Sequence, residues 1–421
     1  MKGSGPRARA LAQRLALHES RNVTHTAGNP IFWESARGAI VTDVDGNDYI
    51  DCTAAFGVAN AGHANPHVAE AIAAQARTLV HGMGDVHPTE IRVQLLERLK
   101  MLLPAELNTL YIGTTGSDAV ETALKTAILH KGKARFAAFR NGYHGLSFGA
   151  LNVAGIERFR EPFVKGLANE PVLLPFPEAG VDDARAAIEA AERALAGCDD
   201  LAALVVEPIQ GRGGAVVPPK GYLRALRELC ARRGILLVVD EIYTGFGRTG
   251  TMFAIEREDI VPDILCIGKA LGNGFPISAT IGRADVMAAW PPSSGEALHT
   301  ATFLGHPIGC AAALATLDEF ERLQLVSRAK RVGSEMASRL QTWHRYPQVT
   351  RVRGRGMLFG IVFETAATAA TVVNRALAAG VIVLQSGSDG SVVTVAPPLT
   401  IETEQLDTAL GTLEVAVSDA A

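Results

Sequence analysis

The chain has 421 residues, more than one hydrophobic core usually covers, so we expect two or three packed units. Apolar residues make up 48% of the sequence and charged residues 20%, which excludes a chain that is disordered along most of its length. The formal net charge of −4 provides no general basic field, so neither nucleic acid nor an anionic membrane is an expected partner.

The five cysteines do not have the spacing of a metal site or of a disulfide framework. They are odd in number and far apart, at positions Cys52, Cys198, Cys230, Cys266 and Cys310. The sequence also has no apolar run near the ~20 residues that a membrane span needs. These features predict a cytoplasmic protein with no membrane segment and no metal site.

Short apolar runs alternate with helix-like stretches between about residues 109 and 285. The predicted strands cover residues 109–112, 134–139, 201–206, 235–239 and 263–267, and helices such as 183–195 and 222–233 lie between them. Near-continuous apolar strands that alternate with helices predict an α/β domain whose mostly parallel sheet is covered on both faces. Ligands of such sheets bind beyond the carboxyl ends of the strands.

The two ends of the chain predict a smaller α+β domain. A hairpin signal, Asp43-Val-Asp-Gly-Asn47, lies near the N-terminus, and an alanine-rich helical stretch after residue 309 leads to short strands near 357–363, 381–384 and 392–395. We therefore expect residues 1–60 to contribute to the small domain, residues 61–310 to form the large domain and residues 311–421 to complete the small one.

Lys269 is one of only nine lysines, and it lies between a predicted buried strand and a glycine-rich turn. Apolar surroundings lower the pKa of an ammonium group, and a lysine of this kind is suited to Schiff-base chemistry with a carbonyl compound. On position alone, a surface lysine at a strand end is the alternative.

Three other strand ends carry residues that match one cofactor. Asp240 ends a buried strand and could pair with a protonated pyridine nitrogen, or it could cap a turn. Gly116 and Ser117 open a helix, where they could bind a phosphate or act as an ordinary cap. Tyr143 could stack on a flat ring. Together with Lys269, these residues match what pyridoxal 5′-phosphate (PLP) needs.

The same stretches resemble class III aminotransferases of the 4-aminobutyrate and acetylornithine type, which are fold-type I PLP enzymes. The resemblance runs from about residue 30 to residue 405. Its matching stretches are Thr114-Thr-Gly-Ser-Asp-Ala-Val-Glu, Tyr143-His-Gly, Glu207-Pro-Ile-Gln-Gly, Asp240-Glu-Ile-Tyr-Thr-Gly-Phe-Gly-Arg-Thr-Gly, Pro262-Asp-Ile-Leu-Cys-Ile-Gly-Lys and Thr300-Ala-Thr-Phe-Leu-Gly-His-Pro.

The resemblance implies a role for each matching residue. Lys269 would bond covalently to the cofactor and move the substrate proton, and Asp240 would hold the pyridine nitrogen. The two ring faces would be covered by Tyr143 and Ile242. The phosphate would be bound by Gly116 and Ser117, and Thr302 would reach the phosphate of the neighbouring subunit's cofactor, which implies a homodimer.

Three positions depart from the family pattern. Tyr243 replaces a glutamine that bonds the cofactor's phenolic oxygen in many relatives. Thr394 stands where glutamate-using relatives have a carboxylate-binding arginine, and Leu146 where 4-aminobutyrate-using relatives have another. Glu207 would thereby lose its usual arginine partner and would either face the substrate or bond a nearby backbone or side-chain donor. We therefore expect an amine substrate without an α-carboxylate, such as a diamine or an amino sugar.

The expected reaction is amino-group transfer from a primary amine to a carbonyl acceptor. A racemase, epimerase or aminomutase of the same family would use the same residues and is the first alternative. A cofactor-free scaffold with the same fold is the second, and intact Lys269, Asp240 and Tyr143 argue against it.

Overall fold

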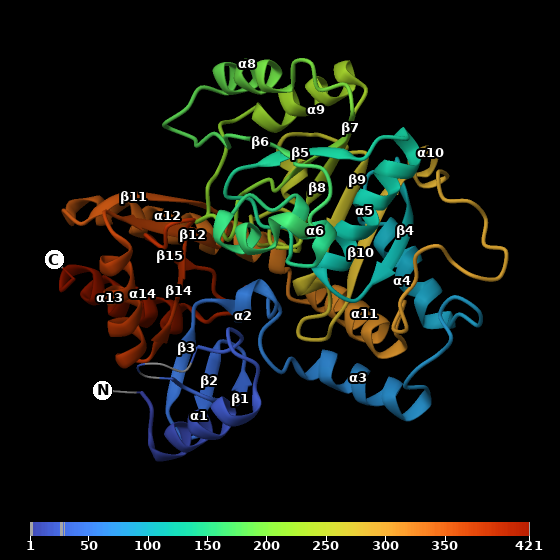
Figure 1. Ribbon diagram of the computed structural model, residues 1–421. Helices are drawn as coiled ribbons and strands as arrows, with labels where there is room; N and C mark the ends of the chain where they lie inside the picture. The colour runs from blue at the N-terminus through green and yellow to red at the C-terminus, as the bar shows by residue number, and fades with distance from the viewer. Residues whose placement is uncertain (1–2, 26–27, 29, 421) are drawn as a thin grey trace.

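The computed structural model describes residues 3–25, 28 and 30–420. Its largest element is a seven-stranded sheet with the strand order β4-β10-β9-β8-β7-β5-β6 (Figure 1). These strands are β4 (Leu107–Gly113), β5 (Arg135–Phe139), β6 (Val172–Leu174), β7 (Leu201–Val206), β8 (Leu236–Asp240), β9 (Ile264–Ile267) and β10 (Ser278–Arg283). β10 pairs antiparallel with both neighbours, and the pairs from β9 to β6 are parallel. The predicted mostly parallel α/β sheet is confirmed.

Successive residues of the central strands enter two separate cores. In β5, Phe136 and Ala138 pack into the core beneath α5 (Gly116–Lys131), whereas Ala137 and Phe139 face the core on the other side. Side chains of a strand alternate between the two faces of the sheet, so burial of both faces requires an uninterrupted apolar run. The other helices of this part are α3 (Pro66–Thr78), α4 (Glu90–Lys100), α6 (Phe148–Asn152), α7 (Glu157–Arg160), α8 (Ala184–Leu195), α9 (Tyr222–Arg233), α10 (Ala284–Met287) and α11 (Pro307–Arg322).

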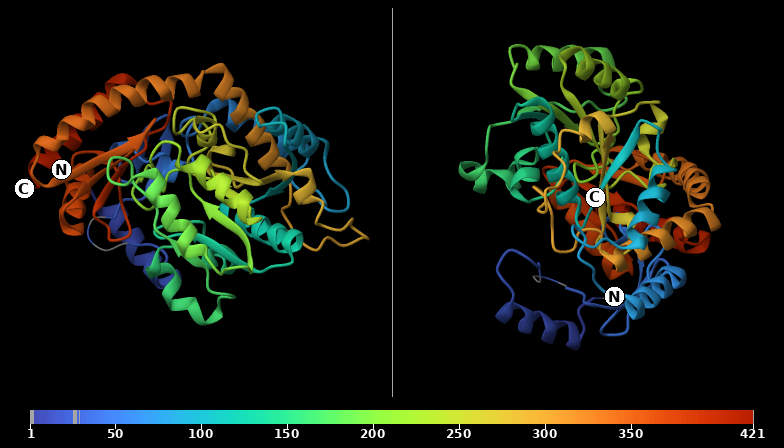
Figure 2. Two further views of the ribbon diagram at one scale, coloured as in Figure 1. Left: turned by 90° about the horizontal axis from the view of Figure 1, so that it is seen from above. Right: turned by 90° about the vertical axis from the view of Figure 1, so that its right-hand side faces the viewer.

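The two ends of the chain meet in a second sheet, in the order β1-β2-β3-β13. Its strands are β1 (Trp33–Arg37), β2 (Ile40–Asp43), β3 (Asp48–Asp51) and β13 (Val381–Ile382), and the predicted hairpin is the β2–β3 pair. Ile50 and Val381 are register partners although they lie far apart in the sequence. Figure 2 shows the blue N-terminal part beside the red C-terminal part.

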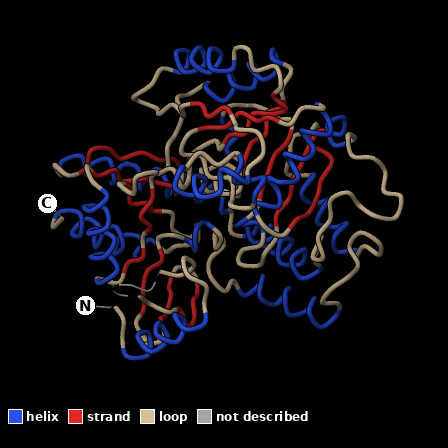
Figure 3. Tube along the Cα trace, viewed as in Figure 1, coloured by secondary structure: helices blue, strands red, loops and turns tan. Residues whose placement is uncertain are grey.

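A third, antiparallel sheet has the order β11-β12-β15-β14. It consists of β11 (Val349–Arg355), β12 (Leu358–Phe363), β14 (Leu384–Ser386) and β15 (Val392–Val395). The remaining helices are α1 (Pro6–His18), α2 (Ala54–Gly57), α12 (Leu325–Gln341), α13 (Ala366–Ala378) and α14 (Thr403–Ser418). Figure 3 shows loops gathered between the central sheet and these C-terminal strands. Helix α11 continues across the domain boundary predicted at residues 310 and 311, and the predicted division stays a prediction.

Within the described ranges, no helix is long and apolar enough to cross a membrane.

Candidate functional site

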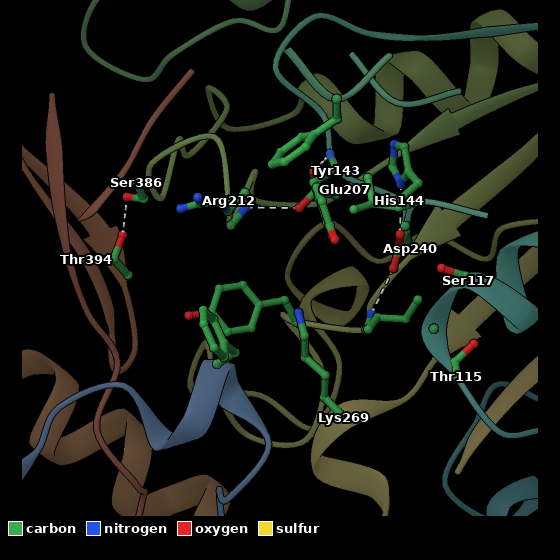
Figure 4. Close-up of a pocket in the computed structure, with 18 of the residues that line it drawn as sticks. Thr115, Ser117, Tyr143, His144, Glu207, Arg212, Asp240, Lys269, Ser386 and Thr394 are labelled. Atoms are coloured by element: carbon green, nitrogen blue, oxygen red, sulfur yellow. Dashed lines mark hydrogen bonds and ion pairs between the residues drawn. The ribbon is translucent and has the colours of Figure 1, made fainter. Parts of the chain in front are cut away.

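A cavity of about 440 Å³ lies at the carboxyl ends of the parallel strands. Nine of the ten predicted site residues line it: Gly116, Ser117, Tyr143, Glu207, Asp240, Ile242, Tyr243, Lys269 and Thr394. Eight of these residues lie at or just after the ends of β4, β5, β7, β8 and β9. The ninth, Thr394, lies on β15. Because parallel strands end at one edge of a sheet, residues that are far apart in sequence surround one space. In Figure 4, Lys269 points up into the cavity, Asp240 and His144 lie at the upper right, and Ser386 and Thr394 lie at the left.

The N-terminus of α5 offers hydrogen-bond donors at one end of this cavity. Thr115, rather than Gly116 or Ser117, caps the helix, and its hydroxyl accepts from the N–H of Asp118 at 3.1 Å. The N–H groups of Gly116 and Ser117 have no acceptor within the described part of the chain. Two unused N–H groups, the Ser117 hydroxyl and the positive end of the helix dipole suit a phosphate group.

Two glycines allow the groups around this end to approach one another closely. A Cβ atom on Gly116 would lie 3.0 Å from the side chain of Ile242. A Cβ atom on Gly145 would lie 2.1 Å from the Ser117 hydroxyl, and Gly145 has a φ of 113°. A larger residue at Gly145 would displace Ser117, so the glycine keeps the hydroxyl within the donor group.

Asp240 is buried, and the imidazole of His144 is its side-chain partner. Nδ1 of His144 lies 2.8 Å from Oδ2 of Asp240, and the backbone N–H of Ile242 donates to Oδ1 at 3.0 Å. A carboxylate accepts only, so Nδ1 carries the hydrogen. Burial lowers the pKa of His144, but the hydrogen bond and charge of Asp240 outweigh it, and the pKa lies above its usual value. No lysine or arginine forms an ion pair with Asp240 within the described residues.

Lys269 follows β9 in a left-handed conformation, with a φ of 44°. Non-glycine residues in this region cost of the order of 1–3 kcal/mol, and they cluster at functional sites. Burial lowers the pKa of the Lys269 ammonium, which the negative charges of Asp240 and Glu207 partly oppose. Its Nζ atom lies 4.1 Å from the centre of the Tyr243 ring. A larger fraction of this amine is therefore neutral than for a lysine in water.

The Tyr243 ring lies between two glycines. Cβ atoms on Gly57 and Gly211 would lie 2.2 Å and 2.0 Å from its carbon atoms. Gly57 ends a left-handed turn in which Ala54, Ala55 and Phe56 also have positive φ angles. Both glycines are needed because no other residue leaves room for the ring.

Glu207 has two backbone partners, as in the alternative that it bonds nearby donors instead of substrate. Its Oε1 accepts from the backbone N–H of Tyr143 at 2.8 Å, and its Oε2 accepts from Gly211 at 3.0 Å. Burial raises the pKa of Glu207 to about 7, although His144 and these two N–H groups oppose the rise. The carboxylate therefore holds two loops of the site together, and the argument for a cationic substrate loses its premise.

At the opposite side of the cavity, Thr394 pairs with Ser386, and their hydroxyl oxygens lie 2.5 Å apart. Leu146 also lines the cavity. Neutral groups thus occupy both positions at which the resemblance would place carboxylate-binding arginines. However, Arg212 lines the cavity too, and the sequence reasoning missed it. The available signal was its place directly after the Glu207-to-Gly211 stretch at the end of a buried strand.

Thr302 is the one predicted residue that does not line this cavity. It is exposed on the loop between α10 and α11. A role in the site of another subunit stays a prediction.

Comparison with known proteins identifies the family. The model of the family described as "Aminotransferase class-III" matches residues 22–417. The chain belongs to this family. It is 37% identical to the acetylornithine aminotransferase of Methanosarcina mazei, over 94% of this chain and 95% of the relative. It is also 37% identical to the 5-aminovalerate aminotransferase of Pseudomonas putida, over 96% and 97% of the two chains.

Solved structures of transaminases have the same fold. A PLP-bound amine transaminase from an uncultivated Pseudomonas species has a TM-score of 0.89 at 32% identity, over 96% of this chain and 100% of that one. An (S)-enantioselective omega-transaminase from Thermomicrobium roseum has a TM-score of 0.92 at 27% identity, covering 98% and 99%. This class III protein is thus a PLP-dependent aminotransferase. The relatives named here are all aminotransferases, which favours transfer over isomerisation.

The cavity fits PLP on its own chemistry. The unused N–H groups at the start of α5 match the phosphate, the buried carboxylate of Asp240 matches a pyridinium N–H, and the Lys269 amine matches an aldehyde.

Proposed function

We propose that this aminotransferase takes the amino group from a carbon that carries no carboxylate. The observation that carries the proposal is the Ser386–Thr394 hydroxyl pair, because glutamate-using relatives would have an arginine at position 394. Thr394 and Leu146 supply no charge for a carboxylate next to the reacting carbon. Arg212, the arginine in the cavity wall, is bonded to Gln385 on the side away from Asp240 and Ser117 (Figure 4). An anion that leaves water without a cationic partner is disfavoured.

The names of the relatives support this proposal. In 5-aminovalerate the amino group and the carboxylate are at opposite ends, and amine transaminases are named for amines. A diamine or an amino sugar also has a primary amine without an α-carboxylate. Since Glu207 already has two backbone partners, it no longer favours these cationic or polyhydroxylated amines over others.

We also propose how the residues act. PLP, when bound, supplies an aldehyde that condenses with primary amines and a ring that withdraws electrons from the adjacent C–H bond. The N–H groups of Gly116 and Ser117 would hold its phosphate, and Tyr143 and Ile242 would pack against its ring. Asp240, oriented by His144, would hold the proton of the ring nitrogen. Lys269 takes the proton from the substrate carbon and returns it, which its lowered pKa favours.

We further propose that two copies form a homodimer in which Thr302 serves the partner's site. Support comes from apolar side chains exposed on two adjoining loops: Leu79, Val80, Met83, Val86 and Phe303. His81 and Phe303, whose ring centres lie 5.5 Å apart, join the loops. Apolar surface of this kind marks protein interfaces.

All five cysteines are free thiols, which supports the reducing environment of a cytoplasm.

A donor screen tests the proposed function. The PLP-loaded protein would be mixed with α-amino acids, ω-amino acids, diamines, amino sugars and simple amines, with an oxo acid as acceptor. The change in the cofactor's absorbance and the formation of a carbonyl product should be fastest with donors that lack an α-carboxylate. Glutamate and alanine as the best donors would contradict the proposal, and an isomerised amine without carbonyl product would contradict transfer.

A further inference from the structure

Arg212 is held in the wall of the cavity by the C-terminal part of the chain. Its Nη1 atom donates to the backbone oxygen of Gln385 at 2.7 Å, and its own backbone oxygen accepts from the N–H of Gly387 at 3.1 Å. Gln385 adjoins Ser386, so Arg212 lies beside the Ser386–Thr394 pair, as Figure 4 shows. The guanidinium is thus fixed at the junction between the loop after β7 and strand β14.

The charge of Arg212 has no carboxylate partner within the described residues. Gln385 provides a neutral oxygen, and the nearby Glu207 is already bonded to Tyr143 and Gly211. Burial, followed by the positive charge of Arg158, lowers the pKa of Arg212. A half-buried cation next to a second cation is unfavourable unless an anion joins it.

Arg212 also lies away from the reacting end of the cavity. The charged groups that shift the pKa of Lys269 are Asp240, Glu207 and Arg248. In Figure 4, Arg212 lies toward Ser386 and Thr394, whereas Asp240 and Ser117 lie on the opposite side. An anion bound by Arg212 would therefore belong to the far end of the substrate.

From this placement we infer that Arg212 determines specificity by binding a substrate carboxylate remote from the reacting nitrogen. One Nη1 hydrogen bond to Gln385 leaves the Nε and Nη2 side of the guanidinium fork for a carboxylate, the planar group that such a fork fits best. One of the paired Ser386 and Thr394 hydroxyls donates to the other, so the second keeps its hydrogen for the same carboxylate. The family pattern would place an arginine at position 394 on β15. In this chain the cation is instead Arg212, on the loop after β7.

Arg158 adds a second positive charge near this end. It is exposed, and its guanidinium carbon lies 5.0 Å from the ring centre of Phe159, which lines the cavity. An exposed cation near a cavity attracts anionic ligands from solution, and salt weakens this attraction. Arg158 therefore aids entry, while Arg212 makes the contact.

The test compares donors that differ only in the remote carboxylate. Rates with 5-aminopentanoate and with pentylamine would be measured for the wild type, Arg212→Gln, Arg212→Lys and Arg158→Gln, with the exposed Arg193→Gln on α8 as control. Arg212→Gln should reduce kcat/KM for 5-aminopentanoate by roughly 10- to 100-fold and leave pentylamine within about twofold. Arg212→Lys should recover part of the loss, and Arg158→Gln should cause a smaller loss that disappears in high salt.

A binding measurement separates this inference from the proposed function, on which it rests. Pentanoate has the carboxylate but no amine, so calorimetric titration of the PLP-loaded protein measures the contact without turnover. Weaker binding of pentanoate to Arg212→Gln, at an unchanged melting temperature, would support the inference even if the donor screen failed. The inference would be overturned if pentanoate bound equally to the wild type and to Arg212→Gln, or if Arg212→Gln lost activity equally with 5-aminopentanoate and pentylamine. It would also be overturned if the wild type preferred diamines, or if the variant lost most activity with α-amino acids.

Discussion

The Nζ atom of Lys269 lies 4.1 Å from the centre of the Tyr243 ring, a distance at which a cation and an aromatic face attract. Burial destabilises the ammonium form of Lys269, whereas an aromatic face at this distance favours a cation. The Tyr243 ring fits at this place because neither Gly57 nor Gly211 carries a Cβ atom, which would clash with it. The ring therefore positions the lysine and also affects its protonation.

Removal of the ring should lower the pKa of Lys269 further. We expect Tyr243→Leu in the cofactor-free protein to react with pyridoxal at lower pH than the wild type, because the ammonium loses its aromatic partner. A cation–π contact of about 0.5–1 kcal/mol corresponds to roughly half a pH unit. The measurement is the pH dependence of the reaction rate, whose wild-type midpoint should already lie below the ordinary lysine value of 10.5. Tyr243→Phe keeps the ring and serves as the control. An equal shift in both variants would show that the ring face has no effect.

A methyl group at position 211 should disturb the site through Tyr243. The Cβ atom of Gly211→Ala would lie 2.0 Å from Cδ1 of the ring, so the ring has to move. We expect a loss of about 1–3 kcal/mol in the free energy of unfolding. In a Tyr243→Ala background the same change should cost little, because the clash is gone. A double-mutant cycle of denaturant unfolding measures this coupling. Additive effects of the two changes would refute it.

Loss of the His144 donor should slow turnover more than it weakens binding. In His144→Phe, Oδ2 of Asp240 loses its hydrogen-bond partner while the carboxylate stays buried. A carboxylate that has lost this hydrogen bond is less firmly oriented toward a pyridinium N–H. We expect kcat to fall roughly tenfold, about 1.4 kcal/mol, with KM nearly unchanged. Partial rescue by His144→Gln, together with a changed pH profile of kcat, would distinguish this role from a structural one. A change in KM alone would argue against it.

Mixed dimers should reveal whether Thr302 serves the partner's site. If it does, a dimer of one Lys269→Ala chain and one Thr302→Ala chain has one site with both defects and one with neither. Lys269→Ala alone should abolish turnover, because it removes the amine that moves the proton. Loss of the Thr302 hydroxyl should weaken PLP retention by about 1.5–3 kcal/mol, the range for a hydrogen bond to a charged group. Isolated mixed dimers, with one intact site of two, should have about half the activity of the wild type.

The control for the mixed dimers is Ser293→Ala, on the same exposed loop. It should leave PLP retention unchanged. Sedimentation that shows a fully active monomer would rule out the shared site. Mixed dimers that are no more active than the two variants alone would also rule it out.

Part of the molecule could be predicted from the sequence because local pattern determines it. The apolar runs of β5, β7, β8 and β9 required a sheet buried on both faces, and parallel strands end at one edge, so Gly116, Tyr143, Glu207, Asp240 and Lys269 had to lie near one another. Strand β10 was not predicted. It is the antiparallel strand of the sheet, inserted between β4 and β9, and nothing in its own residues indicates that place.

The tertiary structure alone decided which groups are partners within the site. The partners of Glu207 are backbone N–H groups, which every residue carries, so no residue type could indicate them. The fit of the Tyr243 ring depends on Gly57, which reaches it only because a left-handed turn folds back from the N-terminal part. Arg212 faces the cavity because Gln385 fixes its guanidinium there. Sequence patterns determine which residues a strand end presents, but hydrogen bonds and packing between distant segments determine where their charges lie.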